Sequence, residues 1–156
     1  MTIFRIYKLM TKIIRPFFYL VFIYRLFKNK EERGKYSERK GFSSNKKPKG
    51  KIVWIHAASV GETLSSLPLI EKLKELSPKI NIIITTGTKT SKEIIVKNKI
   101  DDLIHQYVPW DNKKFCINFL NFWQPDLAIF LESEIWPNLL NETNKKNIPL
   151  CLVNAR

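Results

Sequence analysis

The sequence predicts an α/β fold, a parallel sheet covered on both faces by helices and preceded by a membrane-associating helix. From residue 51 onward, five short apolar runs alternate with four longer amphipathic segments, as in a parallel sheet with helical crossovers. The short runs are apolar throughout instead of alternating, which indicates strands buried on both faces. The expected strands are 52–56, 80–85, 104–108, 127–131 and 149–153. The expected helices are 62–76, 89–96, 113–122 and 137–146.

Charge and composition divide the chain into three expected parts. These are a membrane-anchor or interfacial helix at 1–27, a basic linker at 28–50 and the α/β domain at 51–156. The first 50 residues hold 14 Lys and Arg residues against three acids, whereas the whole chain holds 27 against 14. The α/β domain is therefore close to neutral. A uniformly basic nucleic-acid-binding domain would not divide in this way, so no nucleic-acid partner is expected.

The first 27 residues combine apolar and aromatic side chains with regularly spaced basic ones. Arg5, Lys8, Lys12 and Arg15 follow one another at intervals of three or four residues, so a helix would carry them on one face. Pro16 opens an uncharged stretch that is far shorter than the ~20 apolar residues of a spanning helix. We expect a helix that lies in the membrane interface. The alternative is an ordinary amphipathic helix packed on the domain.

Ligands of such sheets bind beyond the carboxyl ends of the strands, and small or polar residues follow each expected strand here. Glu62 is the sharpest candidate among them. It follows Gly61 and opens an expected helix, where the helix dipole favours an ionised carboxylate. It could act as a general base, or it could be a first-turn acid that complements the dipole. The sequence leaves both interpretations open.

Two further carboxylates, Glu132 and Glu134, follow the fourth expected strand. If that strand extends, both point to one face and interact; otherwise one of them precedes the next helix. Such a pair could also bind a cation in a receiver-like or nucleotide-binding domain. The hydroxyl-rich stretch 85–91 could hold a phosphate, although it lacks P-loop spacing. The histidines and cysteines lack the spacing of a metal site, so no metal is expected.

Several segments resemble the motifs of bacterial 3-deoxy-D-manno-octulosonic acid (Kdo) transferases. Residues 56–63 read H-A-A-S-V-G-E-T and resemble the signature H-x-x-S-V-G-E-T. Residues 132–138 resemble E-T/S-E-L/I-W-P-N, and residues 148–156 resemble I-P-L…N-A-R. Residues 38–42 resemble E-R-x-G-F, and residues 85–90 depart at single positions from T-T-x-T-x-T-G. Motifs of this length, in this order, are specific.

The resemblance implies an inverting glycosyltransferase of the GT-B type, which has two Rossmann-like domains. This chain would be its N-terminal half, an incomplete Rossmann-like parallel sheet that binds the acceptor. Such an enzyme transfers Kdo from CMP-Kdo to the lipid A precursor, lipid IVA, at the cytoplasmic face of the bacterial inner membrane. Glu62 would be the general base, and Glu132 would stabilise the transition state. The implied substrate-binding residues are Ser59, Gly61, Thr86, Thr88, Glu134, Asn138 and Arg156. Inner-membrane lipids would be partners, and no cofactor is expected because CMP-Kdo is the donor substrate.

The chain ends at Arg156, whereas the chains of the family that it resembles continue into a donor domain. We therefore expect the 156-residue chain alone to be inactive. The alternative function is that of a non-catalytic remnant that binds the membrane and the lipid A precursor.

Overall fold

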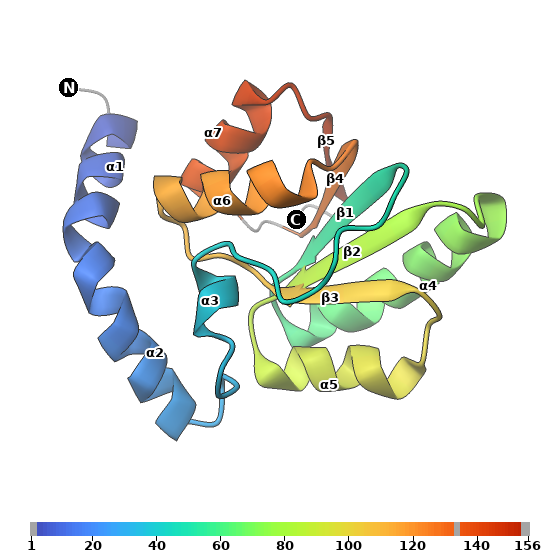
Figure 1. Cartoon of the computed structure of the whole chain (residues 1–156), viewed down its shortest axis with the longest axis horizontal. Coiled ribbons are helices and arrows are strands. Elements are labelled where there is room, and N and C mark those ends of the chain that lie inside the picture. The colour runs from blue at the N-terminus through green and yellow to red at the C-terminus, as the bar shows by residue number, and fades with distance from the viewer. Residues whose placement is uncertain (1–2, 133–134, 154–156) are drawn as a thin grey trace.

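The structure, a computed structural model, describes residues 3–132 and 135–153, and its described part contains a five-stranded parallel sheet (Figure 1). The strand order is β3-β2-β1-β4-β5, and each neighbouring pair is parallel. The strands are β1 (Ile52–Ala57), β2 (Asn81–Thr86), β3 (Leu103–Tyr107), β4 (Leu127–Leu131) and β5 (Leu150–Val153). This architecture confirms the predicted α/β fold.

Helices cover both faces of the sheet. They are α4 (Val60–Leu76), α5 (Lys89–Asn98), α6 (Lys113–Trp123) and α7 (Pro137–Lys145). The residues of strand β1 pack alternately into two hydrophobic clusters, one on each face of the sheet. Ile52 and Trp54 pack in the cluster that includes residues of α6 and α7. Their neighbours Val53 and Ile55 pack in the cluster that includes residues of α4 and α5. Burial on both faces explains why the strand sequences are apolar throughout.

The helices begin at residues whose side chains satisfy the first backbone N–H groups. Ser59 caps α4, Thr88 caps α5 and Asn112 caps α6, each by accepting a hydrogen bond from an N–H of the first turn. Helix α7 begins instead with Pro137, which has no N–H to satisfy. All four starts follow the carboxyl ends of strands, so much of the polar chemistry of the chain gathers at that edge.

The N-terminal segment forms two helices, α1 (Ile3–Ile14) and α2 (Phe18–Phe27), joined by a 3-10 turn at Arg15–Phe17 (η1). Pro16 lies inside this turn, as its effect on a helix predicts. Phe22 is buried, and Phe18 packs with its ring centroid 4.9 Å from that of Trp110. Within the described residues, no helix combines the length and the apolar character that crossing a bilayer requires.

The opposite side of this helical segment is open to solvent. Of its described residues, twelve large hydrophobic ones are exposed, and we call them the apolar face: Ile3, Ile6, Leu9, Met10, Ile13, Ile14, Phe17, Tyr19, Leu20, Val21, Tyr24 and Phe27. A monomeric soluble protein rarely exposes so many large apolar residues on one element. The segment thus packs on the domain and still presents an apolar surface.

Residues 28–50, expected from composition to be a linker, pack closely on the domain. They include the short helix α3 (Tyr36–Arg39) and bury Glu31, Glu38 and Arg39. The tight contact also explains Gly41, whose φ is +83° and whose position leaves no room for a Cβ beside the carbonyl oxygen of Phe115. The segment therefore fastens α2 to the sheet; the proposed domain boundaries stay a prediction.

Candidate functional site

Glu62 lies in the first turn of α4 and folds its side chain back onto the start of the helix. Its Oε2 accepts a hydrogen bond from the backbone N–H of Ala58 at 2.6 Å, and its Oε1 accepts one from the hydroxyl of Ser59 at 2.8 Å. In return, Ser59 Oγ accepts from the N–H of Glu62 at 3.2 Å. The residue is only 4% exposed. These reciprocal contacts form a variant of the capping box, so Glu62 has a structural role whatever its chemical one.

Gly61 and Ser59 have different structural roles. Ser59 is exposed and caps α4, whereas Gly61 has an ordinary helical backbone within α4. The nearest atom to a Cβ built on Gly61 is Ser59 Oγ at 4.0 Å, so an alanine would fit there. Gly61 therefore makes no tight turn that would let a ligand approach the backbone. The close approach occurs instead at Gly87, where a Cβ would collide with the carbonyl of Ala58.

Thr86, the last residue of β2, and Thr88, two residues further on, use their hydroxyl groups within the protein. Thr86 Oγ1 lies 2.8 Å from Nε2 of His105, and Thr88 Oγ1 accepts from the N–H of Ser91 at 3.2 Å. Burial, followed by the charge of Lys92, lowers the pKa of His105 to about 3, so this ring is neutral at pH 7. A capping hydroxyl can still contact a ligand, so the binding roles of Thr86 and Thr88 remain predictions.

The second candidate carboxylate, Glu132, stands just beyond the end of β4. Strand β4 stops at Leu131, and Glu132 has a φ of +58°, in the left-handed region. Its N–H donates to the carbonyl of Val153 at 2.9 Å, which holds it beside β5. The extended arrangement that would align the two carboxylates therefore ends before Glu132. A non-glycine residue in this conformation costs about 1–3 kcal/mol and is often found at functional sites.

The remaining predicted site residues have different surroundings. Asn138 is buried and donates to the backbone carbonyl of Asp111 at 2.7 Å and to Thr11 Oγ1 at 3.3 Å, while its Oδ1 has no hydrogen-bond partner among the described residues. Asn138 thus connects α7 with α1. Glu134 and Arg156 lie outside the described residues. Their predicted roles are not affected by these observations.

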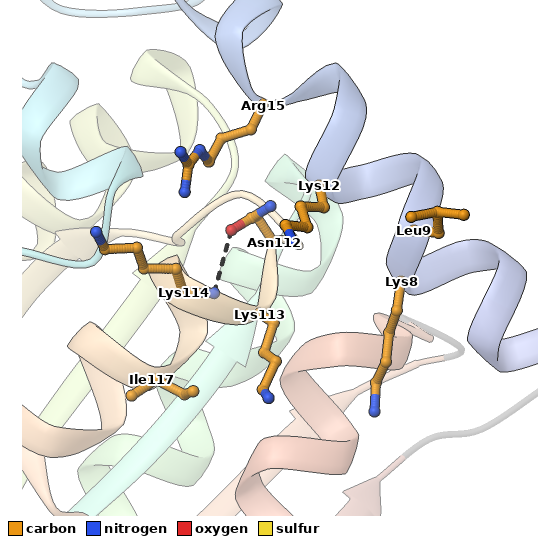
Figure 2. Close-up of a pocket in the computed structure, with 8 residues that line it drawn as sticks. All are labelled: Lys8, Leu9, Lys12, Arg15, Asn112, Lys113, Lys114 and Ile117. Atoms are coloured by element: carbon orange, nitrogen blue, oxygen red, sulfur yellow. Dashed lines mark hydrogen bonds between the residues drawn. The ribbon is translucent and has the colours of Figure 1, made fainter.

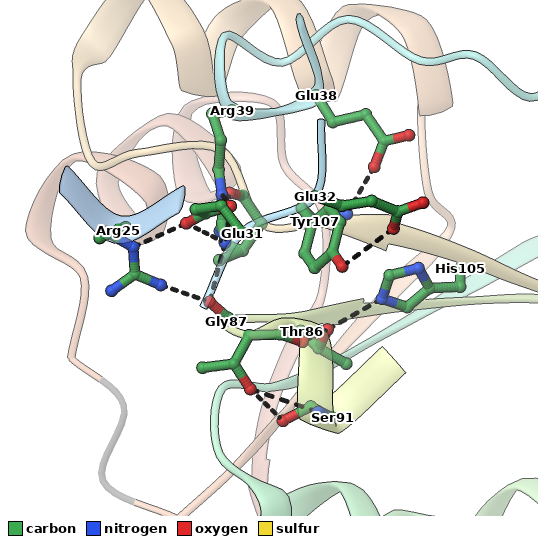
Figure 3. Close-up of polar contacts among 12 residues, drawn as sticks. Arg25, Glu31, Glu32, Glu38, Arg39, Thr86, Gly87, Ser91, His105 and Tyr107 are labelled. Carbon is green, nitrogen blue, oxygen red and sulfur yellow. Dashed lines mark hydrogen bonds and ion pairs between the residues drawn. The ribbon is translucent and has the colours of Figure 1, made fainter. Parts of the chain in front are cut away.

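Sequence reasoning did not find a buried guanidinium at this edge of the sheet. Arg39 is 1% exposed and binds both carboxylate oxygens of Glu31, with Nη2 2.8 Å from Oε1 and Nε 3.0 Å from Oε2 (Figure 3). Burial lowers the pKa of Arg39, while the adjacent Glu31 raises it. The only signal in the sequence was the motif at 38–42, which contains Arg39 without revealing its partner.

The same ion pair reaches the ends of two strands. Arg39 donates to the carbonyl of Val108 at 3.0 Å and to that of Gly87 at 2.8 Å, and Arg25 of α2 donates to the same Gly87 carbonyl at 2.9 Å. Arg25 also binds Glu31, with Nε 2.7 Å from Oε1. Figure 3 shows these side chains converging on Gly87. The cluster connects α2 and the 28–50 segment to the ends of β2 and β3.

The structure brings the predicted site residues at the ends of β1, β2 and β4 to one edge of the sheet. Strand β1 lies between β2 and β4, with Ala57 beside Thr86 and His56 beside Phe130. Glu62, Thr86 and Glu132 therefore lie at or just beyond the carboxyl ends of three neighbouring strands, on the same side of the sheet. This is the place where a parallel α/β sheet binds ligands. Among the described residues, no group of three or more His, Cys, Asp or Glu side chains could hold a metal ion.

Comparison with known proteins places these features in a family. The family model described as 3-deoxy-D-manno-octulosonic-acid transferase (kdotransferase) matches residues 34–156. The chain is 36% identical over 152 residues to the 3-deoxy-D-manno-octulosonic acid transferase of Rickettsia bellii, which covers 97% of this chain and 36% of that protein. It is 38% identical over 130 residues to the protein of the same name from Haemophilus influenzae, covering 83% of this chain and 30% of that protein.

A plant protein gives a similar result. The probable mitochondrial 3-deoxy-D-manno-octulosonic acid transferase of Arabidopsis thaliana is 32% identical over 154 residues, covering 99% of this chain and 34% of that protein. The chain thus spans about a third of the length of these curated relatives. Since the family model covers most of the chain, including the strand-end loops of Glu62, Thr86 and Glu132, the chain belongs to the 3-deoxy-D-manno-octulosonic acid transferase family of glycosyltransferases.

Proposed function

We propose that this chain is the acceptor-binding, N-terminal part of a GT-B enzyme that transfers Kdo from CMP-Kdo to the lipid A precursor, lipid IVA. The observation that carries the proposal is the position of Glu62. Two hydrogen-bond donors, Ala58 N–H and the Ser59 hydroxyl, hold its carboxylate at the edge where the ends of β1, β2 and β4 meet. A carboxylate fixed in this way is a suitable general base, provided that the acceptor hydroxyl reaches it there.

In this mechanism the acceptor hydroxyl gives its proton to Glu62 as its oxygen bonds to the anomeric carbon of Kdo. The bond from that carbon to the phosphate oxygen of CMP breaks, and the electron pair leaves with CMP. Attack from the face opposite the leaving group inverts the configuration. The anomeric centre becomes cationic on the way, and the strained position of Glu132 would hold a second carboxylate near it.

The replacement Glu62→Gln in the full-length protein tests the base separately from the helix cap. Glutamine also fits a capping box, so the fold should be kept while the basic group is lost. We expect kcat to fall by about 10²–10⁴-fold, the usual contribution of a general base, with little change in the melting temperature. The measurement is transfer of radiolabelled Kdo to the lipid A precursor.

The control for this experiment is Glu71→Gln, an exposed carboxylate on the same helix, which should leave turnover unchanged. Turnover in Glu62→Gln equal to that of the wild type would exclude Glu62 as the base. Loss of activity together with a much lower melting temperature would show that Glu62 is needed for the helix cap.

We also propose that the protein acts at the cytoplasmic face of the inner membrane, with the apolar face of α1 and α2 on the bilayer. The support is the exposure of large apolar side chains beside basic ones on an interrupted, amphipathic segment. This arrangement would bring a lipid acceptor and the candidate base to the same surface.

The alternative is a non-catalytic remnant that binds the membrane and the lipid A precursor, and the exposed apolar and basic side chains of the N-terminal segment support such binding. We expect the 156-residue chain to bind vesicles without transferring Kdo. A transfer assay on this chain decides the matter, because turnover would rule out the remnant.

A further inference from the structure

A groove between α1 and the start of α6 is rich in positive charge. Its volume is about 510 Å³, and it is lined by Lys8, Leu9, Lys12, Arg15, Asn112, Lys113, Lys114 and Ile117. Figure 2 shows these side chains gathered where the N-terminal helical segment runs past the first turn of α6. Five of the eight lining residues are cationic and none is acidic, so the groove is suited to an anion.

The cations of the groove have no acidic partner among the described residues, unlike the basic residues that fasten the 28–50 segment to the domain. Arg25 and Arg39 are paired with Glu31, and Lys35 is paired with Glu38. By contrast, Lys12, Arg15, Lys113 and Lys114 make no ion pair within the part of the chain that the structure describes. The charge at the groove is therefore uncompensated by the protein.

The walls of the groove are held in place by hydrogen bonds. Tyr7 Oη donates to Asp111 Oδ2 at 2.7 Å, and Asn112 Nδ2 donates to the carbonyl of Thr11 at 2.9 Å. Asp111 also accepts from the N–H of Asn138 at 3.0 Å, which ties the same loop to α7. The groove thus exists before any ligand binds, which lowers the entropic cost of binding.

One feature identifies the kind of anion. The groove contains Leu9 and Ile117 among its cations, and Leu9 also belongs to the apolar face. A ligand with a phosphate and an attached acyl chain would satisfy both parts, with the phosphate among the Lys and Arg side chains and the chain along Leu9. The first turn of α6 adds the positive end of a helix dipole.

We propose that this groove binds the phosphate of an anionic glycerophospholipid supplied by the bilayer itself. The lipid would be a structural partner and not the sugar acceptor. This inference rests on the proposed membrane orientation and extends it, since an apolar face alone would not select among lipids. The chemistry of the groove selects for negative head groups.

Vesicle flotation of the 156-residue chain tests the proposal, with phosphatidylcholine vesicles that contain or lack phosphatidylglycerol. The double variant Lys12→Gln/Lys113→Gln removes one cation from each wall. Each cation near an anionic surface contributes about fivefold to binding, so we expect the partition into phosphatidylglycerol vesicles to fall by roughly 25-fold. Binding to pure phosphatidylcholine should be the same for the variant and the wild type.

The matched control is Lys79→Gln/Lys97→Gln, which removes the same charge at exposed positions, in the turn between α4 and β2 and near the end of α5. We expect less than a twofold change, and unchanged melting temperatures will show that both variants fold. Equal losses in the two double variants would mean that net charge alone attracts the membrane, and the groove would be excluded. The same exclusion follows if phosphatidylglycerol does not strengthen binding.

A titration with a soluble short-chain phosphatidylglycerol separates the lipid from free phosphate. The backbone amide signals of Lys113, Lys114 and Ile117 should shift and saturate, and Lys12→Gln/Lys113→Gln should abolish saturation. Inorganic phosphate at the same concentrations should give no saturating shift. Equal saturation by inorganic phosphate would overturn the assignment to a lipid, and so would the absence of shifts with the lipid. Both outcomes leave the transfer assay of Glu62→Gln unaffected.

Discussion

His56 is a titratable side chain completely enclosed by the domain. It is 0% exposed, its Nδ1 lies 3.0 Å from Thr85 Oγ1, and its Nε2 has no hydrogen-bond partner within the described residues. Burial lowers its pKa to about 4, although a hydrogen bond with the backbone of Thr85 opposes the shift. The imidazole is therefore neutral at pH 7, where it can fill the core without a counter-ion.

The stability of the chain should depend on pH because of this residue. The unfolded chain binds a proton at a pKa near 6.5 and the folded chain only near 4, so stability is complete above about pH 6.5 and is lost as the pH falls toward 4. We expect His56 to reduce the free energy of unfolding by about 2 kcal/mol between pH 7 and pH 5. Urea unfolding at the two pH values measures this change.

The variant His56→Gln should be less sensitive to pH than the wild type. Some dependence will remain, since His105 also has a lowered pKa and acts in the same direction. An unchanged difference between pH 7 and pH 5 in the variant would show that His56 is not the titrating group.

The sequence predicted where the chemistry lies better than what each residue does. Glu62, Thr88 and Glu132 were singled out because they follow strands, and the structure does bring those junctions together. A hydroxyl or carboxylate at such a junction can cap a helix or bind a ligand, and the sequence pattern is the same for both. Thr88 caps α5 and Glu62 is part of a cap, so the binding roles need experiments.

At the scale of elements, the Arg39–Glu31 pair fastens α2 and the 28–50 segment to the sheet. Replacement of one partner in a buried pair leaves the other charge uncompensated, which usually costs 3–5 kcal/mol. We expect Glu31→Gln to lower the free energy of unfolding by about 3 kcal/mol, because Arg39 and Arg25 then share a site without an anion. Chemical denaturation measures the effect.

The pair Lys72–Glu75 provides the control, since its side chains are 59% and 68% exposed. Exposed pairs contribute little, so Glu75→Gln should change the free energy by less than about 0.5 kcal/mol. If Glu31→Gln were equally mild, the buried pair would not be what holds α2 to the sheet.

The elements themselves were predictable because each has a local signal. The five strands and four domain helices begin and end within two residues of their expected positions. The packing of residues 28–50 had no such signal. Its basic and polar composition is typical of a linker, and the strand-end partners of Glu38 and Arg39 lie far away in sequence, at Gly87, Tyr107 and Val108.

At the scale of the whole molecule, the apolar face of α1 and α2 determines how the protein would meet a membrane. The double variant Phe17→Ser/Leu20→Ser removes two side chains of this face that are 56% and 61% exposed. Partial burial of both in lipid contributes on the order of 2 kcal/mol, so vesicle binding should weaken about 30-fold. Vesicle flotation with and without anionic lipid measures this loss of binding.

The matched control replaces exposed apolar residues at the far side of the molecule. Leu76→Ser/Val96→Ser changes side chains that are 69% and 62% exposed, near the ends of α4 and α5 that point away from α1 (Figure 1). Vesicle binding should stay within twofold of the wild type. If this control weakened binding as much as Phe17→Ser/Leu20→Ser, the apolar face would not be the membrane surface.

The hydrogen bonds from Tyr7 to Asp111 and from Arg25 to Gly87 attach both halves of the N-terminal helical segment to the edge that carries Glu62. A bilayer that contacts this segment would therefore lie at a fixed height and a fixed tilt relative to that edge. Lipids with head groups of different length would present their hydroxyl groups above or below the carboxylate of Glu62. The protein would therefore select its acceptor by the length of the head group.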